Sequence, residues 1–202
     1  MANLENNIEL SRQLAEAVMA KSCAINEEQK LKEQNLAIPT IKRGYYIDAA
    51  KAFTEAEKMP DGPERIESWK KAAALYKVAL YKAPSHDEAP EAAMNGAISF
   101  KQVGDYDQAI EMYSLFIKEY GGNDVLTKLE KGDPGAKPPK PPNPDKYGER
   151  VIYLKQAYDA LSAAYVLFFN YRTAAETYDI VSKIDRFNEE ERREAARGFD
   201  LA

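Results

Sequence analysis

A helix–turn–helix of small and aromatic residues between Pro90 and Tyr120 constrains the fold of this chain more than any other segment. Gly96 and Ala97 on its first half and Ala109 on its second are small enough for two helix backbones to cross closely. Between them, Gly104 supplies a residue that adopts the left-handed conformation with which many helices end. The segment therefore predicts two antiparallel helices joined by a tight turn.

Aromatic residues in the same segment lie at fixed offsets from the small ones, at Phe100, Tyr106, Tyr113 and Phe116. This arrangement matches a repeat of about 34 residues whose first position is Pro90. The small, glycine and aromatic residues that are typical of such a repeat are then Ala97, Gly104, Tyr106, Ala109 and Tyr113. On these residues the chain resembles a tetratricopeptide repeat (TPR) protein. The resemblance implies a right-handed superhelical array of helical hairpins that holds other proteins.

Two further segments resemble repeats, and the first of them is degenerate. Residues 42–82 contain a break at 60–63, followed by Trp69, Ala72, Tyr76 and Ala79 at the spacing of a repeat's second helix. Residues 151–183 restore the pattern after an insertion of about 30 residues, an estimate made against the repeat length. In this last repeat Phe169 stands where the turn glycine is usual, so we expect a tighter or differently shaped turn.

Composition agrees with an all-α fold, because runs of β-branched residues are scarce. The net charge of −5 argues against nucleic acid as a partner. No apolar stretch approaches the roughly 20 residues that span a bilayer, and the first 30 residues are polar with no signal-peptide core. We therefore expect a soluble chain without direct membrane insertion. The single Cys23 leaves the compartment open between a periplasm, as a mature domain, and a cytoplasm.

We expect four parts along the chain. Residues 1–38 form an N-terminal helical arm, in which one polar helix over 3–35 has a narrow apolar stripe and ends at Ile38-Pro39. This arm either lies against the first repeat or docks a partner. Residues 39–120 hold TPR-like repeats 1 and 2, residues 121–150 the proline-rich insertion, and residues 151–202 repeat 3 and a terminal helix.

The insertion and the terminal helix carry local signals of their own. Pro138 to Pro142 favours polyproline II and contains PxxP spacing, so it is either a ligand for SH3 or WW domains or a solvated spacer. Asn123 and Asn188 are candidate N-caps of short helices. The last helix either caps the array or opens a fourth repeat, and its end inside a helical pattern leaves a longer chain open.

Enzyme signatures are absent from the sequence, so we expect no catalytic residues, no cofactor and no metal. There is no phosphate-binding glycine loop, nucleophile elbow or His–Glu metal motif. His86 is the only histidine and follows Pro84-Ser85 in an expected turn, where a structural role is favoured. Among the tyrosines outside the repeat pattern, Tyr45, Tyr46 and Tyr147 either fill the core or line a recognition surface.

The resemblance to TPR proteins also suggests where a partner binds, because their first helices line the inner face of the array. The residues there that the pattern does not use for packing are Met94, Ile98, Lys101 and Gln102 in the central repeat and Asp159, Ala163, Val166 and Leu167 in the last. This mixture is apolar with few charges, so it suits an extended peptide or an amphipathic helix. Met94 and Ile98 replace polar residues of the repeats that clamp chaperone carboxylates, which makes that ligand a poor match.

The sequence therefore favours a non-enzymatic interaction scaffold that binds a peptide or helix. Residues 103–122 are similar in style to the repeats of bacterial envelope-associated TPR proteins, which implies a place in such an assembly. The alternative is a structural or oligomerisation module that self-associates through residues 1–38, or a fragment of a longer TPR array.

Overall fold

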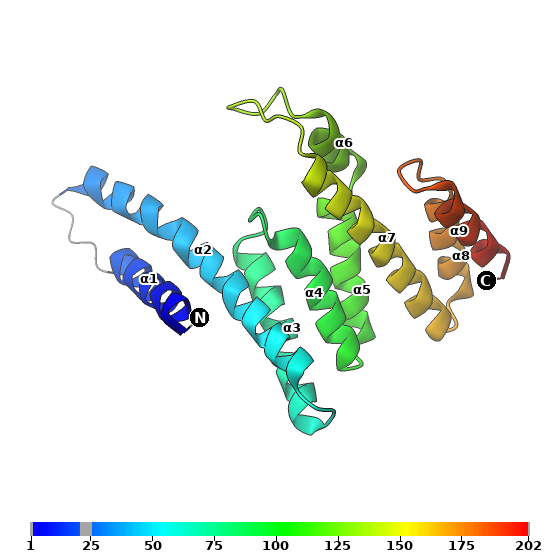
Figure 1. Ribbon diagram of the computed structural model, residues 1–202, viewed down its shortest axis with the longest axis horizontal. Helices are drawn as coiled ribbons and strands as arrows, with labels where there is room; N and C mark the ends of the chain where they lie inside the picture. Colours follow the sequence, from blue (N-terminus) through cyan, green and yellow to red (C-terminus); the bar gives the residue numbers. More distant parts are fainter. Residues whose placement is uncertain (1, 21–25, 202) are drawn as a thin grey trace. The chain divides into compact units, whose positions relative to one another are not determined.

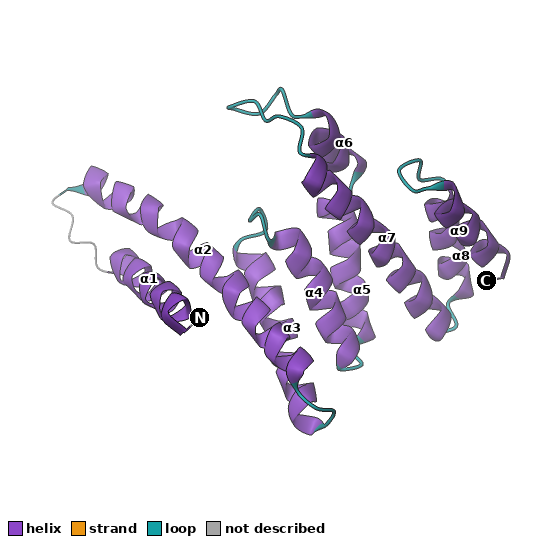
Figure 2. Cartoon of the chain, viewed as in Figure 1, coloured by secondary structure: helices purple, strands orange, loops and turns teal. Residues whose placement is uncertain are grey.

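The computed structural model describes residues 2–20 and 26–201, and Cys23 lies outside them. Within these ranges the secondary structure is helical and contains no strand, so the all-α expectation is confirmed (Figures 1 and 2). The chain divides into two compact units, Met1–Ser99 and Phe100–Ala202. Each unit is described by itself below.

The first unit is built from long helices that lie side by side. Helix α1 (Ala2–Ala20) packs on α2 (Glu27–Lys58), and α2 packs along α3 (Pro63–Lys82) (Figure 1). Helix α4 (Ala89–Gln102) follows and ends within the second unit. The second helix that the sequence predicts after the break, within residues 42–82, is α3.

Pro39 does not end a helix, and the expected break at Ile38-Pro39 is wrong. Helix α2 runs through it without interruption, so the single arm helix expected over 3–35 is instead α1 and the first part of α2. Proline removes one backbone hydrogen bond and crowds the preceding turn. The helical residues on both sides and the packing of α2 against α1 and α3 outweigh that local preference.

The core of the first unit combines alanine faces with a cluster of aromatic rings. Alanines with at most 2% exposure line the facing helices at Ala49, Ala52 and Ala56 of α2 and at Ala72, Ala73 and Ala79 of α3. Phe53 of α2 meets Trp69 at a centroid distance of 5.0 Å and Tyr76 at 6.0 Å, both edge-to-face. These rings fill the space beside the close-packed alanines, as the small and aromatic pattern predicts.

Tyr46 and His86 fasten the turn after α3 to α2. The Tyr46 hydroxyl donates to the carbonyl of Ala83 at 2.7 Å, and its ring stacks on His86 at 4.7 Å. The Nδ1 atom of His86 accepts from the backbone amide of Glu88 at 3.3 Å. Both residues therefore hold the backbone of this turn, and Tyr46 belongs to the core.

The second unit is organised around α7 (Pro144–Leu167), the yellow helix in Figure 1. It packs against α5 (Tyr106–Leu115), the π-helix η1 (Phe116–Tyr120), α6 (Asn123–Lys131) and α8 (Tyr171–Ser182). Helix α9 (Glu189–Leu201) packs on α8. The long α7 thus contacts most of the other elements of the unit.

One local expectation in this unit is wrong for an identifiable reason, and the proline run makes a contact that the sequence does not predict. Asn123 is not an N-cap, because Gly122 holds that position and the Asn123 side chain instead accepts from Arg186 at 3.0 Å. Lys140, within the proline run, forms an antiparallel bridge with Asp133, with backbone hydrogen bonds of 2.8 and 3.0 Å. A hydrogen bond from Arg186 therefore takes the place of the cap at Asn123, and the bridge ties the proline run to Asp133.

The start of α9 confirms the predicted cap at Asn188. The Asn188 side chain accepts from the amide of Glu191 at 2.9 Å, and the Glu191 carboxylate accepts from the amide of Asn188 at 3.0 Å. This reciprocal pair is a capping box. Further along α9, a methyl group at Gly198 would lie 2.9 Å from the Tyr178 ring, so glycine allows α8 and α9 to approach closely.

Tyr76 makes the first unit sensitive to alkaline pH. Burial raises the pKa of Tyr76 to about 12, although the hydrogen bond from Asn95 at 3.4 Å lowers it. Below the ordinary value of about 10 the phenol is protonated in both states. Between about pH 10 and pH 12 the unfolded chain releases this proton first, so the free energy of unfolding falls by roughly 2–3 kcal/mol.

We therefore expect the Tyr76→Phe variant to lose less stability than the wild type between neutral pH and about pH 11, because it lacks this titration. Urea unfolding at both pH values measures the difference. Equal losses in the two proteins would show that Tyr76 titrates normally in the folded state.

Candidate functional site

The turns after α4 and α7 have the same backbone geometry, although one contains glycine and the other phenylalanine. After α4, Gly104 has φ 79° and the amide of Asp105 donates to Phe100 at 3.0 Å. After α7, Phe169 has φ 57° and the amide of Asn170 donates to Tyr165 at 2.8 Å. Asp105 and Asn170 then N-cap the next helices. The expectation of a differently shaped turn at Phe169 is therefore wrong.

The left-handed conformation of Phe169 is unfavourable. A side chain with a β-carbon loses about 1–2 kcal/mol there relative to an ordinary backbone conformation, whereas glycine does not. Burial of the side chain offsets little of this cost, because Phe169 is 78% exposed and its ring lies 6.1 Å from the ring of Tyr171, centroid to centroid. A strained and exposed aromatic residue is a mark of a functional position.

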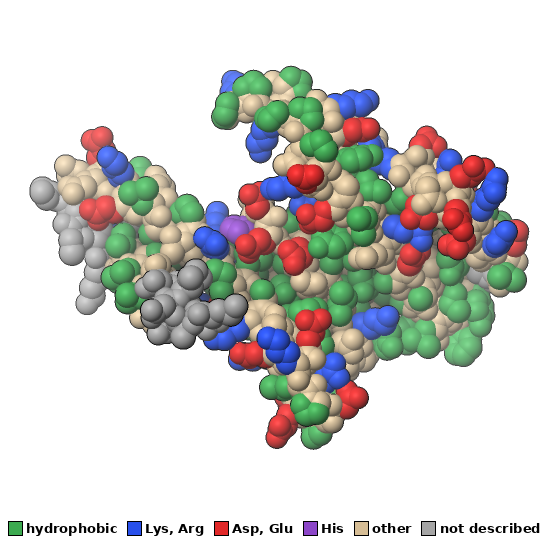
Figure 3. All heavy atoms as spheres, viewed as in Figure 1, with side chains coloured by type: hydrophobic (Ala, Val, Ile, Leu, Met, Phe, Trp, Pro, Cys, Tyr) green, Lys and Arg blue, Asp and Glu red, His purple; other side chains and the backbone are tan. Residues whose placement is uncertain are grey.

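Phe169 is the centre of an exposed apolar segment, residues 166–171, which we name the α7–α8 tip. Five of its six residues are large and apolar, and each is between 39% and 78% exposed: Val166, Leu167, Phe168, Phe169 and Tyr171. Figure 3 shows hydrophobic side chains gathered at the lower right, where α7 meets α8. Exposed apolar residues are common singly, but a contiguous group marks an interaction surface.

A groove of about 220 Å³ lies beside the tip, between α5 and α7. We name it the α5–α7 groove, and it is lined by Lys101, Tyr106, Ala109, Ile110, Tyr113, Ala160, Ala163, Ala164 and Leu167. Leu167 belongs to both the groove and the tip. The edge of Tyr106 contacts Phe168 at a centroid distance of 5.4 Å, which joins the two surfaces.

The chemistry of the α5–α7 groove is apolar. Among the described residues that line it, only Lys101 is charged. Burial raises the pKa of Tyr113, so its hydroxyl stays neutral at physiological pH. Such a surface suits the side chains of an apolar peptide or helix.

The structure brings together part of the predicted partner surface. Lys101, Ala163 and Leu167 line the groove, and Val166 lies on the tip. Asp159 is exposed and pairs with Lys155 at 2.6 Å. Three others do not line the groove: Gln102 is exposed at the end of α4, whereas Met94, 3% exposed, and Ile98, half-buried, lie in the first unit. That these residues bind a partner stays a prediction.

Sequence reasoning missed the residues that give this site its character, chiefly Phe168, Phe169 and Tyr171 on the tip and Ile110 and Ala160 in the groove. A signal was present, because residues 160–171 contain no charged side chain in a chain with 30% charged residues. A run of consecutive apolar residues across a predicted turn is unusual unless it serves a function.

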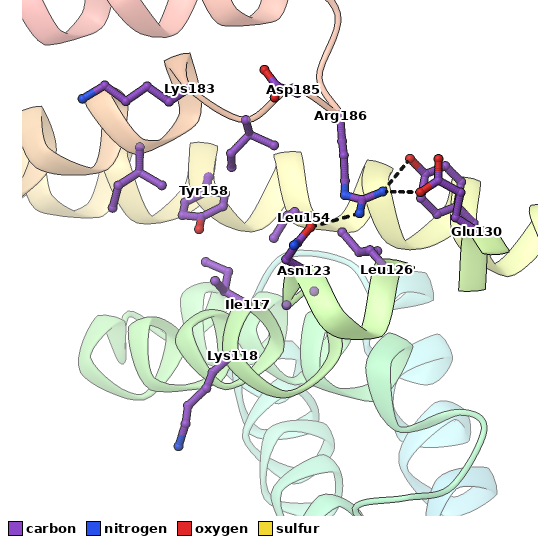
Figure 4. Close-up of a pocket in the computed structure, with 15 residues that line it drawn as sticks. Ile117, Lys118, Asn123, Leu126, Glu130, Leu154, Tyr158, Lys183, Asp185 and Arg186 are labelled. Carbon is purple, nitrogen blue, oxygen red and sulfur yellow. Dashed lines mark hydrogen bonds and ion pairs between the residues drawn. The ribbon is translucent and has the colours of Figure 1, made fainter. Parts of the chain in front are cut away.

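A larger cavity of about 750 Å³ lies elsewhere in the second unit (Figure 4). Its floor is Leu154 and Tyr158 of α7, and its walls come from η1 and α6 on one side and the end of α8 on the other. Figure 4 shows Arg186 reaching from the segment after α8 across the cavity towards Asn123 and Glu130.

Arg186 is fully engaged by the protein. Its guanidinium donates to Glu130 at 2.9 Å, Tyr147 at 3.1 Å, Asn123 at 3.0 Å and Thr127 at 2.9 Å. Burial lowers the pKa of Arg186. The hydrogen bonds to Glu130 and Tyr147 and the nearby negative charge raise the pKa by more than burial lowers it, so the net pKa lies above its ordinary value. This arginine therefore links the segment between α8 and α9 to α6, and its guanidinium is already hydrogen-bonded within the protein.

The remaining charges around this cavity are also paired with near neighbours. Lys183 contacts Asp179 at 2.6 Å and Lys118 contacts Glu119 at 3.3 Å. In the described part of the chain, no group of three His, Cys, Asp or Glu side chains is placed to hold a metal ion. Over the same residues, no helix combines the length and apolar character needed to cross a membrane.

We expect Arg186→Lys to lower the free energy of unfolding by about 1–3 kcal/mol, because lysine keeps the charge but cannot make the forked hydrogen bonds. Chemical denaturation monitored by circular dichroism measures the change. Arg172→Lys is the matched control, since Arg172 forms an exposed pair with Glu176 and should change stability by less than about 0.5 kcal/mol. Equal effects would mean that the Arg186 contacts add nothing to stability.

No protein-family model matches the chain, and no curated protein matches it. Among solved structures, the crystal structure of BtubC (BKLC) from P. vanneervenii is similar, with a TM-score of 0.42 and 12% sequence identity. The match covers 99% of this chain and 80% of that chain. Similarity at this level carries no argument about fold or function.

Proposed function

We propose that this chain is a non-enzymatic scaffold for protein–protein interactions, with a TPR-like array of helical hairpins, and that its α5–α7 groove binds an apolar peptide or helix. The observation that carries the proposal is the position of the groove directly beside the exposed α7–α8 tip. Together they form a continuous apolar surface, which a protein partner is the natural ligand to cover.

The uncharged alanine lining of the groove restricts the side chains that a partner can place there. Its alanines, at positions 109, 160, 163 and 164, leave space for side chains of the guest but offer no hydrogen bonds. A charged side chain placed there would lose hydration without gaining a partner. The guest is therefore a segment with an uncharged apolar face, and an acidic residue at its edge suits the exposed Lys101.

The wider setting of the scaffold is proposed from the sequence resemblance. Residues 103–122 resemble repeats of bacterial envelope-associated TPR proteins, so we place the chain in a multiprotein assembly of that kind. Co-purification of partners from a bacterial envelope fraction tests this part of the proposal. If the Ala163→Glu variant retained the same partners, that result would argue against the groove as their binding site.

A fluorescent leucine-rich amphipathic peptide tests the binding proposal directly. We expect Ala163→Glu to weaken its binding about tenfold or more, because the bound apolar peptide would then cover and dehydrate a carboxylate. Fluorescence anisotropy measures the affinity. Ala196→Glu is the matched control, because Ala196 is an exposed alanine on α9 outside the groove.

Either of two results would count against the proposed groove. In the first, the wild-type protein fails to bind any such peptide. In the second, Ala163→Glu and Ala196→Glu weaken binding equally, which would show that the peptide responds to net charge rather than to the groove.

The exposed leucines of the N-terminal helices favour a second function, self-association through residues 1–38. Leu10 and Leu14 of α1 are 54% and 60% exposed and lie on one helix face, and Leu31 and Leu36 of α2 are similarly exposed. We expect the double variant Leu10→Glu/Leu14→Glu to convert an oligomer of this type to a monomer in light scattering. Substitution is preferable to truncation at Pro39, which would cut α2.

A further inference from the structure

The α7–α8 tip and the α5–α7 groove are a projection and a hollow on the same surface. The tip presents Phe169 on a turn, and the groove begins at Leu167, which both surfaces share. A two-fold symmetric interface requires one patch that complements itself, so that each copy gives a projection and receives one. The second unit carries both halves of such a patch.

The groove has room for an aromatic ring. Its volume is about 220 Å³, whereas an apolar protein cavity of about 150 Å³ holds benzene. Alanine side chains form much of its lining, so a ring entering from outside meets few obstacles. Phe169 is the most exposed ring of the tip, and its side chain is not needed to close the turn, since glycine closes the equivalent turn at Gly104.

The charge distribution favours a second copy over a lipid surface. Residues 160–171 contain no charged side chain, so two tips approach without repulsion between like charges. The nearest charge that follows, Arg172, is already paired with Glu176 at 3.1 Å. Binding to an anionic membrane surface relies on clustered cations, which this tip lacks.

The aromatic rings of the tip would supply a substantial part of the area that a standard interface buries. A fully buried aromatic side chain covers about 150–250 Å². From their exposed fractions, Phe168, Phe169 and Tyr171 would together bury roughly 350 Å² of each copy, against about 800 Å² per partner in a standard interface. The aliphatic residues of the tip and the walls of the groove add to this area.

We propose that a second copy of this chain occupies the groove, with the α7–α8 tip of each copy lying in the α5–α7 groove of the other and Phe169 as the anchor. This inference rests on the proposed function, because it names the apolar segment that the groove binds. It differs from self-association through the N-terminal helices in the surface that is used.

The variant Phe169→Gly tests the inference because its two effects have opposite signs. Glycine removes the anchor, so the dissociation constant of the dimer should rise about tenfold or more, as for other aromatic hot spots. Glycine also relieves the left-handed backbone, so thermal unfolding of the dilute monomer should shift upward by about 5 °C. A loss of association together with a rise in thermal stability excludes misfolding as the cause.

Sedimentation equilibrium over a range of protein concentrations measures association. The matched control is Tyr81→Ala, which removes an aromatic residue that is 81% exposed on α3, in the first unit. We expect a wild-type dimer that persists in Tyr81→Ala and is lost in both Phe169→Gly and Ala163→Glu.

Other outcomes overturn the inference in distinguishable ways. A wild-type monomer that still binds the amphipathic peptide, with sensitivity to Ala163→Glu, removes the second copy but leaves the proposed function intact. A dimer that survives Phe169→Gly but is lost in Leu10→Glu/Leu14→Glu assigns association to the N-terminal helices. Binding of the wild type to neutral lipid vesicles that is lost in Phe169→Gly would assign the tip to a membrane. A monomer that binds no peptide removes both proposals.

Discussion

Close approach of helix backbones across alanine faces is the constraint on which both units depend. In the first unit Ala49 of α2 and Ala72 of α3 are fully buried, and in the second unit Ala157 of α7 and Ala174 of α8 are as well. Larger side chains at these positions would push the helices apart. The same residue type lines much of the α5–α7 groove, because alanine side chains are too short to fill the space between α5 and α7.

The sequence predicts helices well where turn chemistry and helix pattern agree. Gly104 and Asp105 mark their turn through a left-handed backbone and an N-cap, and Asn188 marks the start of α9 for the same local reason. Prediction fails where distant contacts decide. Pro39 suggests a helix end that packing overrides, and Asn123 suggests a cap but bonds to an arginine far along the chain.

The candidate site was harder to predict than the fold. The spacing of apolar residues on α7 shows which residues share a face, but it does not show which of those faces another helix covers. The sequence therefore indicates Ala163, Val166 and Leu167 as partner candidates, whereas it indicates Phe169 only as part of a turn. Only the structure shows that Phe169 is exposed in a conformation that glycine would adopt more easily.

Arg186 has a consequence for how the second unit opens. Its four hydrogen-bond partners lie between residues 123 and 147, so this one side chain closes a loop of chain that contains α7 and α8. When α8 and α9 separate from α7, these bonds break and α6 loses its contacts with Arg186 at the same moment. We therefore expect the slow hydrogen exchange of α6 and of α8 to change together, because the contacts of Arg186 link α6 to the segment after α8.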